Sequence, residues 1–219
     1  DSVKAIDIEN PDALTKEEIV NAMKELGLIG LGGAGFPTFI KYGRTDGIHT
    51  IIINGVECEP FLTTDFVSMQ QNAETLVLGC EYLMKASGAS KAIIAFKVHK
   101  EEVKVAIEGK LSEHPNIEIK EVPDQYPMGW ERTLVYEVTK QRYDKLPSEI
   151  GCIVNNAATA ISFAQCLRTG MPIVEKIVTV SGDGVKEPCN VVVPVGVQAC
   201  DLINACGGYT ADDILLIAG

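Results

Sequence analysis

Short apolar runs alternate with helical patterns across the middle of the chain, and this alternation constrains the fold more than any other feature. Each run is rich in β-branched residues and is bounded by polar or turn residues, as buried strands are. A parallel strand can rejoin its sheet only through a crossover connection, and the helical patterns supply such crossovers. The sequence therefore predicts an α/β fold in which helices cover both faces of a parallel sheet. The expected strands are residues 49–54, 91–97, 117–122 and 151–156, and the expected helices are residues 65–86, 100–111, 134–139 and 157–168.

The end of the chain has a different pattern of residues. From Met171 onward, two β-rich runs surround a Gly-Asp-Gly turn, and a helical pattern and a further apolar run, residues 213–219, follow them. A hairpin, a helix and a returning strand make a small β-grasp module. We therefore expect two domains, a Rossmann-like domain over residues 1–170 and a β-grasp domain over residues 171–219. No low-complexity linker separates them, so we expect them to pack together.

Length and charge restrict the kinds of partner. The chain has 219 residues and a formal net charge of −11, with no basic stripe, so we expect no nucleic-acid partner. No segment approaches the roughly 18 uninterrupted apolar residues that span a bilayer, so we expect no direct membrane insertion. The first residues lack a signal-peptide pattern and the cysteines form no C-x-x-C, which indicates a cytoplasmic protein with reduced thiols. The chain begins without Met and stops where an expected strand ends, so we expect a fragment of a longer protein.

A glycine-rich loop is the first candidate site. The segment GLIGLGGAGFPTFIKYG, residues 27–43, contains the spacing G-x-G-x-x-G. However, Thr15 and Glu18 form a capping box, and Gly27 ends the helix that this box begins. The loop therefore follows a helix, whereas a dinucleotide fingerprint follows a strand, and this argues against a Rossmann NAD site. Backbone amides that no side chain covers, followed by a helix that begins at Pro37, are suited to binding an anion. A tight turn between helix and sheet explains the glycines equally well.

Polar residues gather where the expected strands end. The strand that ends at Asn54 delivers Glu57 and Glu59 into one loop, where ligands of parallel sheets bind, although two nearby carboxylates are also typical of a solvated loop. Asn155 and Asn156 precede a helix, where an asparagine can serve as an N-cap or contribute to a phosphate pocket. In YPMGWERT, residues 126–133, the aromatic residues offer a stacking surface or belong to the core. The histidines have no zinc-ligand spacing, so we expect no metal site.

Four motifs in order carry a resemblance to a known family. GLGGAGFPTFIK, INGVECEP, YPMGWERTL and NNAATA resemble the flavin-binding core shared by the C subunit of the Rnf electron-transport complex and the NADH-binding flavoprotein subunit of respiratory complex I. The agreement extends from about Gly27 to Gly208. The Rnf side is closer, because Leu31 and Val56 stand where the complex I pattern has arginine and aspartate.

The resemblance implies an FMN site on a Rossmann-like sheet, followed by a β-grasp module of the soluble-ligand-binding (SLBB) kind. It implies that NADH, as substrate, passes hydride to the flavin, and that iron-sulfur clusters outside this chain receive the electrons. No residue would then be catalytic itself, because the flavin is the reactive group. The implied cofactor-binding residues are Gly30, Gly32, Gly33, Ala34, Lys41, Asn54, Glu57, Gly129, Asn155, Asn156 and Thr159, and the implied NADH-binding residues are Phe36, Glu59 and Glu131.

Three functions remain open on the sequence. The first is the redox core of an Rnf-type NADH dehydrogenase subunit, with other subunits of a redox complex as partners and association with the membrane only through them. The second is a soluble electron carrier or assembly module for a reductase of the proline or cobalamin type, with a degenerate or empty flavin site. Val56 and Trp130, which depart from the family pattern, motivate it. The third, an oxidoreductase that binds NAD directly in the glycine loop, ranks last.

Overall fold

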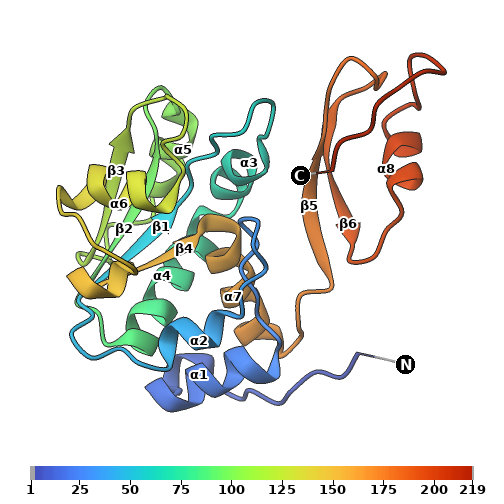
Figure 1. Ribbon diagram of the computed structural model, residues 1–219. Coiled ribbons are helices and arrows are strands. Elements are labelled where there is room, and N and C mark those ends of the chain that lie inside the picture. Colours follow the sequence, from blue (N-terminus) through green and yellow to red (C-terminus); the bar gives the residue numbers. More distant parts are fainter. Residues whose placement is uncertain (1–2, 219) are drawn as a thin grey trace.

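The structure, a computed structural model, describes residues 3–218. A larger α/β part is followed by a smaller part made of a hairpin and one helix, and Figure 1 shows the smaller part set to one side of the larger. The elements of the larger part are η1 (Pro11–Ala13), α1 (Lys16–Glu25), α2 (Thr38–Tyr42), β1 (Thr50–Asn54), α3 (Thr64–Gln71), α4 (Ala73–Ser87), β2 (Lys91–Lys97), α5 (Glu101–Glu108), β3 (Ile117–Val122), α6 (Glu131–Thr139), η2 (Pro147–Ile150), β4 (Cys152–Asn156) and α7 (Ala157–Thr169). The smaller part contains β5 (Glu175–Val180), β6 (Cys189–Pro194) and α8 (Ala199–Ala205).

The predicted parallel sheet is confirmed. Its order is β3-β2-β1-β4, and all neighbouring strands run parallel. Side chains along β1 alternate between two cores, since Ile51 and Ile53 join the core under α4 and α7 while Ile52 joins the core under α6. A strand whose both faces are buried needs this continuous apolar run, which explains why the sequence reveals the strands so clearly. Both faces of the sheet are therefore covered, as predicted.

The helices agree with the sequence in order more than in their limits, since α6 begins three residues before the expected start at residue 134. Thr15 and Glu18 form the predicted capping box of α1, and Gly27 follows this helix with φ +62°. The single long helix expected over residues 65–86 is wrong, because the structure has two helices that meet at Asn72. The side chain of Asn72 donates to the carbonyl of Ser68 at 3.1 Å, and such local bonding by asparagine competes with a continuous helix.

The smaller part forms an antiparallel hairpin with one helix packed on it. β5 pairs with β6, and a small core of Val180, Val185, Ile203 and Cys206 joins the hairpin to α8. The returning strand expected at residues 213–219 is not formed over the described residues 213–218, where Leu215 and Ile217 are exposed. An apolar run becomes a strand only when it pairs with the edge of another strand, and the described residues of this run pair with none.

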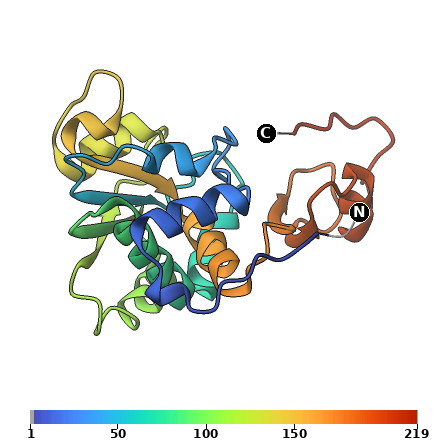
Figure 2. The same cartoon turned by 90° about the horizontal axis from the view of Figure 1, so that it is seen from below.

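The two parts touch where β5 and β6 face the loop before α3. The amide of Thr63 donates to Thr179 Oγ1 at 3.3 Å, and Asn190 Nδ2 donates to Thr63 Oγ1 at 2.8 Å. Within residues 3–218, the two parts pack together at this contact and where β5 meets α3. Figure 2, the view from below, also shows the hairpin and α8 to one side of the α/β part.

Candidate functional site

The carboxyl ends of β1 and β4 define the candidate site. The sheet grows from β1 through β2 to β3 on one side, while β4 is added on the other, so the chain order reverses between β1 and β4. Ligands of open α/β sheets bind in the crevice outside such a reversal. Asn54 and Asn156 are the last residues of the two strands and face each other in the register. The sequence motifs that end the two strands are thus brought together.

The glycine loop lies beside this reversal and is closed at its base. The amide of Gly30 donates to the carbonyl of Phe36 at 2.8 Å, and the amide of Thr38 donates to the carbonyl of Leu28 at 2.9 Å. The loop also docks on α7, because the amide of Leu31 donates to Thr159 Oγ1 at 2.9 Å. Figure 1 shows the loop, in blue, alongside α7. The sequence places this loop after a helix, and the structure accordingly brings it to the sheet from α1 rather than from a strand.

The tip of the loop presents unpaired backbone donors. Among the described residues 3–218, no group accepts a hydrogen bond from the amides of residues 32–36. Gly33 has φ +130°, and a Cβ placed on it would meet no atom within 4 Å, so bare backbone faces open space there. Exposed amides in a glycine loop next to a helix N-terminus are the groups that bind phosphate in proteins. The fit between this loop and an anion is therefore good.

Asn156 links the glycine loop to the first turn of α7. Its Oδ1 accepts from the amide of Thr159 at 3.2 Å, which makes Asn156 the N-cap of α7. A Cβ on Gly32 would lie only 2.9 Å from Asn156 Cβ, so the loop approaches this side chain as closely as a glycine permits. Asn155 lies differently, because it is buried and its Nδ2 donates to Tyr42 Oη at 2.6 Å. Asn155 therefore supports the core beneath the site.

Lys41 and Glu131 are two charged residues of the candidate site, and they lie near enough to interact electrostatically. Lys41 Nζ donates to the carbonyl of Val154 at 2.8 Å. Burial lowers the pKa of Lys41, and the nearby Glu131 carboxylate opposes this effect. Glu131 is exposed at the first residue of α6. A partly buried ammonium with one carbonyl partner keeps further donors for an anionic or carbonyl group of a ligand.

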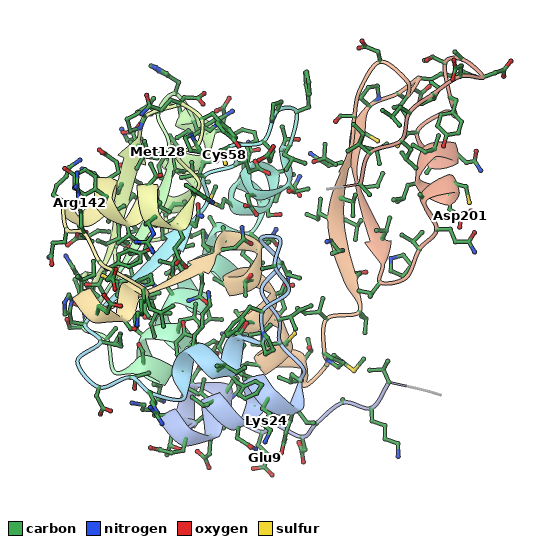
Figure 3. All side chains as sticks on the ribbon, viewed as in Figure 1. Glu9, Lys24, Cys58, Met128, Arg142 and Asp201 are labelled. Carbon is green, nitrogen blue, oxygen red and sulfur yellow. The ribbon has the colours of Figure 1, made fainter. Side chains whose placement is uncertain are left out.

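Asn54 and Gly129 hold two loops together at the edge of the sheet. Asn54 Nδ2 donates to the carbonyl of Gly129 at 2.8 Å, and its Oδ1 accepts from the amide of Val56 at 3.0 Å. A Cβ on Gly129 would lie 2.1 Å from the carbonyl oxygen of Val56 and 3.1 Å from Cys58 Sγ. Figure 3 labels Cys58 and Met128 at this end of the sheet. Asn54 and Gly129 therefore have a structural role in the protein itself, in addition to the binding role that the resemblance implies.

Two carboxyl groups lie at the start of α3. Glu57 accepts hydrogen bonds from Thr64 Oγ1 at 3.0 Å and from the amides of Asp65 and Phe66 at 2.7 and 3.1 Å, so it caps this helix. Asp65 Oδ2 accepts from Asn156 Nδ2 at 2.6 Å. Burial raises the pKa of Asp65 to about 7, and the Glu57 carboxylate contributes to this rise. The sequence pattern does not identify Asp65 as a site residue, because an acid in the first turn of a helix ordinarily faces solvent.

Aromatic side chains are exposed on the loops around the crevice. Phe36 is 44% exposed, Phe61 78%, Tyr126 71% and Trp130 68%, so Tyr126 and Trp130 do not belong to the core. Glu59 is also exposed. Among the described residues, no hydrogen bond joins Phe36, Glu59 and Glu131 to one another. Exposed aromatic faces beside a polar crevice are suited to stacking against planar rings.

Two hollows of the described surface are lined by residues other than those of the glycine loop. One of about 40 Å³ lies beside Glu57 and Phe66, with Lys97 and Lys100 at its rim. A larger one of about 360 Å³ lies between the N-terminal segment and residues 168–170, at the opposite end of α7 from the glycine loop. Arg168 and Asp7 are its only charged lining residues.

The fold and the site together define an α/β domain of the kind that binds nucleotides, followed by a small module of one hairpin and one helix. The chain belongs to the Nuo51 FMN-binding domain family, whose family model matches residues 23–165. A second family model, the SLBB domain, matches residues 177–214. The resemblance and the fold class expected from the sequence are thus confirmed.

Curated relatives agree with this family. The C subunit of the proton-translocating ferredoxin:NAD(+) oxidoreductase complex of Clostridium ljungdahlii is 31% identical over 210 residues, which cover 94% of this chain and 46% of the relative. The C subunit of the ion-translocating oxidoreductase complex of Rhodobacter capsulatus is 35% identical over 218 residues, which cover 95% of this chain and 41% of the relative. The cobalamin reductase PduS of Salmonella typhimurium is 34% identical over 210 residues, which cover 94% of this chain and 45% of the relative. The chain therefore spans less than half the length of these relatives.

A solved structure has the same fold. A chain of the NAD+-reducing NiFe-hydrogenase in its H2-reduced state matches with a TM-score of 0.77 and 26% identity, which covers 90% of this chain and 40% of that one. Within residues 3–218, no helix combines the length and the apolar character needed to cross a bilayer. Of the three curated relatives, two are subunits of ion-translocating complexes and one is a reductase.

Proposed function

We propose that this chain binds FMN in the crevice between β1 and β4, with the phosphate on the glycine loop. The observation that carries the proposal is the run of unpaired amides at residues 32–36, beside the N-terminus of α7 at the reversal of strand order. Membership of the Nuo51 FMN-binding domain family supports the identity of the ligand. An anion on these amides would satisfy donors that the protein leaves unpaired.

The other residues of the crevice would orient the flavin. Gly30, Gly32, Gly33 and Ala34 would supply backbone without bulk, and Lys41 would supply a positive charge at its polar edge. Asn54, Glu57 and Gly129 would border the ring, while Asn156 and Thr159 would hold the loop against α7 and Asn155 would support it from the core. When bound, FMN would supply the ability to accept a hydride and to release electrons one at a time.

We propose NADH as the electron donor and a redox complex as the destination. Phe36, Glu59 and Glu131 would receive the dinucleotide, and the exposure of all three side chains supports this arrangement. The electrons would leave for iron-sulfur clusters outside this chain, in partner subunits or in further parts of the same protein. The names of the relatives, which include two NAD-linked oxidoreductases, support this assignment. We place the boundary between the FMN-binding domain and the SLBB domain near residue 170.

A second candidate function is a carrier or assembly module for a reductase of the cobalamin type. Two observations favour it. Val56 is buried and offers no polar side chain to a flavin, and Trp130 is exposed beside Gly129, where its bulk could occupy the crevice. In this alternative the flavin site is degenerate or empty, and the SLBB domain binds a partner protein.

Titration with FMN separates the two functions. We expect the 219-residue chain to bind one equivalent of FMN, detected by quenching of flavin fluorescence, and anaerobic NADH to bleach the visible absorption of the bound flavin. Riboflavin, which lacks the phosphate, should bind at least about tenfold more weakly, since one charge-assisted hydrogen bond contributes about 1.5–3 kcal/mol. A chain that leaves FMN fluorescence unchanged would support the assembly module instead. Binding without bleaching would retain FMN and exclude NADH as the donor.

A further inference from the structure

The carboxyl of Asp65 lies at the N-terminal end of α7, where it contacts the same Asn156 side chain that Gly32 of the glycine loop approaches. Its Oδ2 accepts from Asn156 Nδ2 at 2.6 Å, and the backbone amide of Ala158, in the first turn of α7, lies close enough to stabilise its charge. The same Asn156 side chain packs against Gly32, and Thr159, also in the first turn of α7, holds the amide of Leu31. The protein thus places an internal carboxyl beside the position where an external anion would bind.

The surroundings of Asp65 contain a second negative group and no close positive one among the described residues. Glu57 faces it from the loop after β1 and accepts three hydrogen bonds at the start of α3. Burial and then the charge of Glu57 raise the pKa of Asp65, to about 7, while Asn156 and the amide of Ala158 oppose them. Neither the glycine loop, residues 30–36, nor the first turn of α7 contains a charged residue.

The lysines of the region are bound to other partners. Lys97 pairs with Asp124 at 2.7 Å, and the ammonium of Lys100 lies 4.6 Å from the ring centre of Phe66. Lys41 donates to a carbonyl of β4, and the Glu131 carboxylate interacts with it electrostatically. Among the described residues, no lysine or arginine acts on the Asp65 carboxylate, so a negative ligand at the glycine loop would add to the repulsion that Glu57 already exerts on it.

We propose that Asp65 takes up a proton when a phosphate monoester binds at the glycine loop, so that FMN binding is linked to the proton concentration. This inference rests on the proposed FMN function. The step is a simple protonation: a proton from the solvent converts the Asp65 carboxylate to the neutral acid, and no bond of the ligand changes. Two anions near one asparagine repel each other, and protonation of the buried one removes this repulsion. The exposed phosphate keeps its charge because the unpaired amides stabilise it.

The affinity for FMN should consequently fall as the pH rises above 7. One linked proton weakens binding by up to about tenfold per pH unit, over the interval between the pKa of Asp65 in the free and in the bound protein. The second ionisation of a phosphate monoester lies near pH 6, so titrations between about pH 7 and 8.5 avoid it. The Asp65→Asn variant keeps an oxygen that can accept from Asn156 and from Ala158 but cannot titrate. Its dissociation constant should change several-fold less per pH unit than that of the unaltered chain.

Two controls isolate the residue and the ligand group. Asp201→Asn removes an exposed carboxylate in α8, away from the site, and should retain the pH dependence of the unaltered chain. Lys41 remains in both variants, so any change of FMN affinity with pH that it contributes is common to all three proteins. Riboflavin, without a phosphate, should bind the unaltered chain with a smaller slope than FMN does.

A calorimetric measurement tests the linkage without any variant. At about pH 7.5, the heat of FMN binding should differ between two buffers of different ionisation enthalpy, by the amount that net proton uptake predicts. Equal heats in both buffers, or equal slopes for the unaltered chain and Asp65→Asn, would overturn the inference while leaving FMN binding intact. Absence of FMN binding at every pH would instead overturn the proposed function, and the inference with it.

Discussion

Replacement of Gly33 by valine should lower the affinity for FMN by at least about 100-fold, which corresponds to about 2.7 kcal/mol. Gly33 has φ +130°, where a β-branched residue is strained by about 1–3 kcal/mol, so the loop must change its backbone to accept the substitution. The amides of residues 32–36 would then no longer point at one anion. No atom lies within 4 Å of the new Cβ position, so the fold itself should persist. Fluorescence titration with FMN measures the loss, and thermal unfolding checks the fold.

Gly182 provides the matched control. It has φ +110° in the turn between β5 and β6, and a Cβ on it would likewise meet no atom within 4 Å. Gly182→Val introduces the same kind of strain far from the crevice, so its melting temperature should fall as in Gly33→Val while its FMN affinity stays unchanged. An equal loss of affinity in both variants would assign the effect to general instability. Unchanged binding by Gly33→Val would show that the phosphate lies elsewhere.

Replacement of Gly129 by alanine should destabilise the chain even without any ligand. The new Cβ would lie 2.1 Å from the carbonyl oxygen of Val56, so the two loops must separate, and the 2.8 Å hydrogen bond from Asn54 to Gly129 would be strained. Overpacking and a lost hydrogen bond together cost about 2–4 kcal/mol. For a chain of this size, that free energy lowers the melting temperature by about 5–15 °C. Thermal unfolding followed by circular dichroism measures the difference.

Gly43→Ala is the control for this prediction. Gly43 has φ −72° at the end of α2, and the nearest atom to its new Cβ would be a carbonyl oxygen at 3.6 Å. Its melting temperature should stay within about 2 °C of the unaltered chain, as expected for a substitution without strain or clash. If Gly129→Ala unfolds at the same temperature as Gly43→Ala, the close approach of Gly129 to Val56 does not contribute to stability, and the glycine serves only to leave room for a ligand.

The sequence predicts the sheet well because the sheet is buried on both faces. Strands such as residues 91–97 must be apolar at every inner position, and their limits in the structure coincide with the predicted ones. The helix break at Asn72 and the unformed strand after residue 212 are different. The first depends on how one asparagine bonds to its own backbone, and the second on whether a partner edge lies within reach. Local hydrophobic periodicity predicts neither feature.

The site was predictable in outline, because the motifs at Asn54 and Asn156 end adjacent parallel strands. The role of the glycine loop could not be predicted from the sequence alone, since its spacing fits an anion site and a tight turn equally well. The structure distinguishes these two interpretations through hydrogen bonds: the base of the loop is paired as in a turn, and its tip is unpaired. Asp65 was not predictable, because its proximity to α7 depends on how α3 packs across the end of the sheet.

Binding of the FMN phosphate by the amides of residues 32–36 is the central claim. Two-dimensional proton–nitrogen correlation spectra of the 15N-labelled chain, recorded during a titration with FMN, test it directly. The cross-peaks of Gly32, Gly33 and Gly35 should move downfield and reach their end point at one equivalent, and riboflavin should move them much less. Cross-peaks that stay in place while resonances elsewhere respond to FMN would contradict the claim.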